Sequence, residues 1–137
     1  MDLDKPPAAL AADAAEAVRA LNHRTLDPAS FENPADAGDV ALHLKSLIDR
    51  LPQALNQLGA GLYRFDADQR IRMDDGTDPC DTVADCLAAL NVARANLTAV
   101  ASALGVVSAR TSHMGGFFND DDEDDAGERI EAEAEHG

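Results

Sequence analysis

Residues 78–107, DPCDTVADCLAALNVARANLTAVASALGVV, decide the fold of this chain. Asp78 and Pro79 are typical of a helix start, because aspartate accepts hydrogen bonds from free amide groups and proline needs no N–H there. Apolar residues follow at alternating intervals of three and four: Val83, Cys86, Leu90, Ala93, Leu97, Val100, Leu104 and Val107. This spacing predicts one long helix with a continuous apolar stripe.

A second stripe of the same kind lies earlier in the chain and begins after Pro34. Its members are Val40, Leu44, Leu47, Leu51, Leu55, Leu58, Leu62 and Phe65. The intervals follow a heptad coiled-coil pattern with a four-residue stutter from Leu51 to Leu55, where Pro52 stands, so we expect a bend at this proline. Gly59 and Gly61 predict that the last turns of this helix fray.

The two stripes match in length, at about 38 and 36 Å for 1.5 Å per residue. Equal helices joined by the short connection 67–77 predict an antiparallel helical hairpin and an all-α fold. A shorter N-terminal helix is expected at 7–21, with Asp4 as its cap. A hairpin alone leaves much of its second stripe exposed. We therefore expect either the N-terminal helix to complete a three-helix bundle or a homodimer to complete a four-helix bundle.

Charge is unevenly distributed along the 137 residues. The whole chain has 26 acidic and 11 basic side chains, a formal charge of −15. Residues 117–137 hold 10 acids and one base, or −9, which leaves 16 acids, 10 bases and −6 for the remainder. We therefore predict three parts: a short helix and linker at 1–33, the hairpin at 34–112, and a disordered acidic tail at 113–137.

The acidic tail is the predicted partner-binding site. Two aromatic rings precede the acidic run, and such a segment suits an apolar groove with a basic rim. The predicted site consists of Phe117, Phe118, Asp120, Asp121, Asp122, Glu123, Asp124 and Asp125. A tail that only keeps the protein soluble is the alternative interpretation. In a third interpretation the acids imitate DNA phosphates and occupy the surface of a DNA-binding protein.

No sequence pattern here predicts catalysis, a bound cofactor or a metal site. The acids at 74–78 do not follow the ligand spacing of a calcium loop, and the histidines stand at neither metal-ligand nor triad spacing. Cys80 and Cys86 are too far apart on one helix for a disulfide, so we expect free thiols. Cys86 is predicted to lie in the core. Cys80 is interpreted as a small residue at a helix start, with a reactive thiol as the alternative.

The expected compartment is the cytoplasm. No apolar run reaches 18 residues, so no membrane span is expected, and the N-terminal residues lack the basic start of a signal peptide. Direct nucleic-acid binding is not expected either. The only basic cluster, Arg64, Arg70 and Arg72, stands among four aspartates.

The chain resembles small helical proteins of actinobacterial plasmids and integrative conjugative elements. The resemblance covers residues 15–108 and rests on VRALNHRTL at 18–26, on 34–37 leading to 51–55, and on 74–79. It implies a mobile-element context and carries no activity. Type VII-secreted helical hairpins are a second, looser likeness, because the Trp-x-Gly turn is missing. The sequence thus predicts a non-catalytic interaction or regulatory module with an unknown protein partner, with a DNA mimic or anti-repressor and a secreted hairpin as alternatives.

Overall fold

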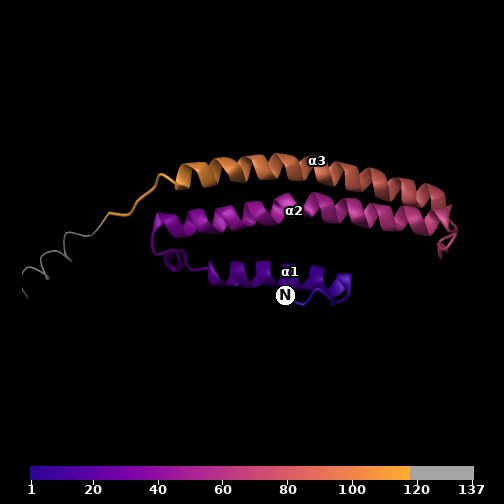
Figure 1. The fold of residues 1–137 in the computed structure, drawn as a ribbon, viewed down its shortest axis with the longest axis horizontal. Coiled ribbons are helices and arrows are strands. Elements are labelled where there is room, and N and C mark those ends of the chain that lie inside the picture. The colour runs from indigo at the N-terminus through magenta and orange to yellow at the C-terminus, as the bar shows by residue number, and fades with distance from the viewer. Residues whose placement is uncertain (118–137) are drawn as a thin grey trace, which may run out of the picture. The chain divides into compact units, whose positions relative to one another are not determined.

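The computed structural model describes residues 1–117, which form α-helices and one short 3-10 helix without any β-strand (Figure 1). The elements are α1 (Pro7–Arg24), η1 (Pro28–Ser30), α2 (Pro34–Ala67) and α3 (Pro79–Thr111). The predicted all-α class is confirmed. The chain divides into two compact units, one of residues Ala35–His113 and one of Met1–Pro34 with the segment that begins at Met114.

The unit Ala35–His113 is an antiparallel hairpin in which α2 and α3 pack side by side (Figure 1). The helices have 34 and 33 residues, as their matched stripes predicted. Neighbouring positions across the interface are Gly38 with Thr111, Lys45 with Gly105, and Gly59 with Leu87. Residue numbers rise along α2 as they fall along α3, which is the order that an antiparallel pair requires.

The face of α3 toward α2 is rotated from the predicted stripe. A regular series of buried and half-buried residues runs through Val83, Leu87, Leu90, Arg94, Leu97, Ala101, Leu104, Ser108 and Thr111. Every second predicted residue belongs to this series, but Cys86, Val100 and Val107 are exposed. The prediction that Cys86 lies in the core was therefore wrong. Alanine and valine cover so much of α3 that two neighbouring stripes are almost equally apolar.

The face of α2 toward α3 also differs from the predicted stripe. Its buried and half-buried series is Gly38, Ala41, Lys45, Ile48, Pro52, Leu55, Gly59, Leu62 and Asp66. The predicted residues from Val40 to Leu51 lie on a different row, while Leu58 and Phe65 are exposed. The stutter in the predicted pattern thus marks a change of face. α2 continues through Pro52 as a single helix.

Gly59 is a contact point, contrary to the expectation of frayed turns. The residue is buried, and α2 runs eight residues beyond it to Ala67. A Cβ at this position would lie 3.1 Å from Leu87 Cδ2 and 3.4 Å from Leu90 Cδ1. The missing side chain therefore lets α3 approach α2 closely, which outweighs the low helix propensity of glycine.

The N-terminal unit contains α1 and η1. α1 begins at Pro7 with Pro6 at the cap position and no side-chain cap, so the prediction of Asp4 as the cap was wrong. Asp4 stands too early in the chain, and its N–H instead donates to Asp2 Oδ1 at 3.0 Å. α1 extends three residues beyond the predicted Leu21 to Arg24 and contains no buried residue.

The predicted cap of α3 is confirmed. Asp78 Oδ1 accepts hydrogen bonds from the Cys80 N–H at 2.8 Å and the Asp81 N–H at 3.4 Å. Asp78→Ala should lower the free energy of unfolding by about 1 kcal/mol, because those amide groups lose their partner. Urea denaturation followed by circular dichroism measures this loss. Asp74→Ala, outside the helix, is the control, and an equal loss there would contradict the role of the cap.

Candidate interaction site

The predicted tail site is represented in the structure by one residue. Phe117 is fully exposed, with a relative accessibility of 104%. Phe118 and the acids at 120–125 lie outside the described residues. The tail site therefore stays a prediction, and its described end presents an aromatic ring to solvent.

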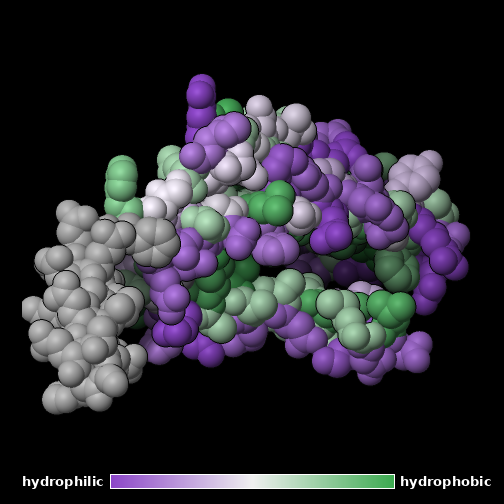
Figure 2. All heavy atoms as spheres, turned by 60° about the vertical axis from the view of Figure 1, so that its left-hand side comes forward, coloured by the Kyte–Doolittle hydropathy of each residue, from purple (hydrophilic) through white to green (hydrophobic). Residues whose placement is uncertain are grey.

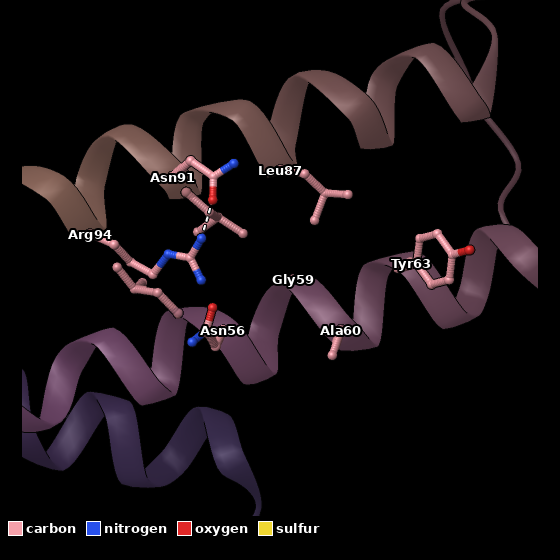
Figure 3. A pocket seen from close by; sticks show the side chains of 9 residues that line it. Asn56, Gly59, Ala60, Tyr63, Leu87, Asn91 and Arg94 are labelled. Carbon is pink, nitrogen blue, oxygen red and sulfur yellow. Dashed lines mark hydrogen bonds between the residues drawn. The ribbon is translucent and has the colours of Figure 1, made fainter.

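A groove between α2 and α3 lies in the half of the hairpin nearer the connection. Its cavity volume is about 320 Å³. Gly59 and Ala60 of α2 leave this space because neither has a long side chain (Figure 3). Leu87 and Arg94 border it from α3, and Tyr63 borders it from α2. The volume falls at the lower end of the usual range for ligand sites, which is roughly 300–1,000 Å³.

Arg94 gives this groove a positive charge. Its half-buried side chain extends from α3 toward α2, and its guanidinium donates a hydrogen bond to Asn91 Oδ1 (Figure 3). No ion pair among residues 1–117 includes Arg94. A guanidinium between two amides, Asn91 and Asn56, is suited to a carboxylate or another anion. In the sequence, Arg94 stands out as the only charged residue between Asp85 and Arg110, but nothing in the sequence places it beside a groove.

Cys80 lies beside the connection, in a small cavity of about 180 Å³ that Asp66 and Asp78 also line. The Asp66 carboxylate raises the pKa of the Cys80 thiol above its ordinary value, with smaller contributions from desolvation, Asp78 and Asp81. Negative charges near a thiol disfavour the thiolate. The alternative interpretation of Cys80 as an activated thiol was therefore wrong. Both cysteines are free and exposed.

The pKa of Cys80 can be tested by alkylation. In a Cys86→Ser background, Asp66→Asn should increase the rate of iodoacetamide labelling of Cys80 at pH 8, because removal of the carboxylate lowers the pKa and increases the thiolate fraction. Asp68→Asn is the matched control. The assignment fails if both substitutions change the rate equally.

Two arginines of the basic cluster near the connection interact with neighbouring side chains. Arg64 Nε lies 3.8 Å from Asp68 Oδ2, and the Arg70 guanidinium lies 5.2 Å from the centre of the Phe65 ring. Within residues 1–117, no group of three His, Cys, Asp or Glu side chains is arranged to hold a metal ion.

The side of α3 opposite α2 forms a second regular series, which we call the outer seam. Its eight residues are all exposed and again alternate at intervals of four and three: Asp85, Ala89, Val92, Asn96, Ala99, Ala103, Val106 and Arg110. Val92 and Val106 have relative accessibilities of 62% and 59%. The Val92 row stands two positions after the Leu90 row, or about 200° around the helix. Figure 2 shows hydrophobic residues at the surface among hydrophilic ones.

α3 also has a length and composition that would allow it to cross a membrane. Its most apolar window has a mean hydropathy of 1.4 over 18 residues, and it is the one such helix in residues 1–117. Helices in the cores of soluble proteins meet the same criterion. Comparisons with protein-family models, with curated proteins and with solved structures found no match to this chain.

Proposed function

We propose that this chain is a non-catalytic helical module that acts by binding another protein. The observation that carries this proposal is the outer seam of α3. It combines exposed valines with small side chains, and no charge stands within it between Asp85 and Arg110. Covering apolar surface is favourable by about 25 cal/mol per Å², so a partner gains from contact along this face.

The thin core of the hairpin supports the same proposal. Among hydrophobic residues in 1–117, only Ala41 and Val83 are buried, with relative accessibilities of 6% and 5%. Small domains that bury little surface are only marginally stable by themselves. A bound partner adds burial and shifts the folding equilibrium toward the native hairpin.

The exposed ring of Phe117 leaves room for a second contact through the tail. In the proposal, the tail residues support recognition, and the hairpin provides the main surface. The likeness of residues 15–108 to actinobacterial mobile-element proteins suggests an accessory role.

Photo-crosslinking in the producing cell tests the proposal. A photoreactive amino acid is placed at Val92 on the outer seam, at Phe117 at the start of the tail, and at Gln53, an exposed control position on α2. We expect protein adducts at Val92 and none at Gln53. Adducts that form only at Phe117, and whose yield falls when duplex DNA competes for the partner, would instead support the DNA-mimic alternative. No protein adduct at Val92 or Phe117 would contradict the proposed function.

A further inference from the structure

We propose that the outer seam of α3 binds the same seam of a second copy of this chain, with the two α3 helices antiparallel. The inference rests on the proposed function and names the partner for one surface of the module. The supporting observation is the order of side chains along the seam. When two copies of the seam run in opposite directions, opposite charges face each other and valines face alanines.

The charges at the seam's two ends set the direction of pairing. Asp85 stands at one end and Arg110 at the other, about 38 Å apart at 1.5 Å per residue. In an antiparallel pair, Asp85 faces Arg110 of the partner subunit, and the two-fold symmetry repeats this ion pair at the other end. A parallel pair would instead place like charges together at both ends.

The same register matches large side chains with small ones. Val92 then faces Ala103 of the partner subunit, and Val106 faces Ala89 of the partner subunit. Alternation of valine and alanine across a helix pair lets the side chains interdigitate while the axes approach closely. Each valine that is exposed in the seam therefore gains a position that accommodates it.

Asn96 lies near the centre of the seam and fixes the register. With Asp85 opposite the partner's Arg110, the two-fold axis passes between Asn96 and Ala99. The two copies of Asn96 then lie near each other at the axis, where their amide groups can hydrogen-bond. A single polar residue in an apolar seam disfavours slipped registers, because slippage buries the amide without a partner.

A second copy explains the outer seam better than a lipid bilayer does. A spanning helix would bring Arg94 and Asn96 into the hydrocarbon, where both are costly. Three further exposed positions beside the seam, Cys86, Val100 and Val107, extend the apolar surface without adding a charge. Because the seam lies opposite α2, a pair of hairpins joined in this way forms a flat layer of four helices with the two α3 helices at its centre.

Single-cysteine crosslinking tests both the face and the direction. The full-length chain carries Cys80→Ser and Cys86→Ser, and then either Asn96→Cys or Ala89→Cys. In the proposed dimer the two copies of position 96 are offset by about 5 Å along the axis, and the two copies of position 89 by about 25 Å. A short bis-maleimide should therefore crosslink Asn96→Cys and leave Ala89→Cys uncrosslinked. Crosslinking of both would indicate a parallel pair and overturn the proposal, as would crosslinking of neither.

Charge reversal tests the pairing without touching the hairpin core. Sedimentation equilibrium should show a dimer for the wild-type chain. Asp85→Arg and Arg110→Asp should each raise the dimer dissociation constant by about tenfold or more, because like charges then face each other. The double variant restores opposite charges and should return the constant to near the wild-type value. Circular dichroism checks that helicity is unchanged in all three.

The outcomes separate this inference from the proposed function. A monomeric wild-type chain whose Val92 still forms adducts with a different protein would overturn the dimer and leave the interaction module standing. A monomer that floats with phosphatidylcholine vesicles, and loses this binding on Val92→Asp, would assign the seam to lipid and overturn both. The proposed register would also be contradicted if the dimer dissociation constant of the double charge-reversal variant stayed as high as those of the single variants.

Discussion

Leu97→Asp should abolish the helical hairpin. Leu97 is half-buried near the middle of α3, in the series that faces α2. The substitution removes apolar burial and brings a carboxylate to a face where desolvation opposes the charge, a combined loss of about 3 kcal/mol or more. Native domains have only about 5–15 kcal/mol of total stability, and a hairpin with few buried side chains is expected at the low end. We therefore expect most of the helical circular dichroism signal to disappear at 25 °C.

Thr98→Asp is the matched control for this prediction. Thr98 is the next residue on the same helix but is exposed, and its hydroxyl donates only to the Arg94 carbonyl at 3.2 Å. The same new charge should therefore leave the melting temperature nearly unchanged. Equal melting of both variants and the wild type would show that Leu97 does not belong to the helix interface.

Gly38→Ala and Gly61→Ala should change stability in opposite directions. A Cβ at position 38 would lie 2.8 Å from Thr111 Oγ1 and 3.0 Å from Thr111 Cβ, whereas a Cβ at position 61 would meet nothing within 4 Å. Thr111 cannot easily rotate away, because its hydroxyl donates to the carbonyls of Val107 and Ser108. We expect Gly38→Ala to cost about 1–3 kcal/mol through overpacking. Gly61→Ala should gain about 0.5–1 kcal/mol through helix propensity.

A double-mutant cycle in urea provides the decisive measurement. Thr111→Ala removes the oxygen that Gly38→Ala would meet but keeps the Cβ, so the double variant should recover part of the loss caused by Gly38→Ala alone. Gly61→Ala combined with Thr111→Ala should be additive, because position 61 is far from Thr111 along the hairpin. Additivity in the Gly38 cycle would contradict the close approach of α2 and α3 at this end.

The sequence predicted the elements well and their contact faces poorly. Asp78 and Pro79 define the start of α3 through local chemistry, so the residues themselves contain the information. The choice between the Leu87 row and the Cys86 row depends on what α2 presents. Gly59 accepts Leu87 and Leu90, and no pattern within α3 records that contact.

The candidate surfaces, like the helices, were predictable only where they depend on local sequence. Composition identified an acidic tail, but not Arg94, whose significance comes from the space above Gly59 and Ala60. The outer seam was partly visible, because the sequence already showed that α3 is almost uncharged around its circumference. Its position became clear only once the opposite face had been assigned to α2. A periodic pattern can indicate that a face is apolar, but the neighbouring element decides which face remains exposed.

The order of contacts along the hairpin also bears on how it folds. Gly59 and Leu87 are 28 residues apart in the chain, whereas Gly38 and Thr111 are separated by 73. Closing a longer loop costs more entropy, so contacts near the connection are the easier ones to form first. Nucleation at that end, followed by zippering toward Gly38 and Thr111, is the pathway that this topology favours. Substitutions near Gly59 should then slow folding, and those near Gly38 should mainly speed unfolding.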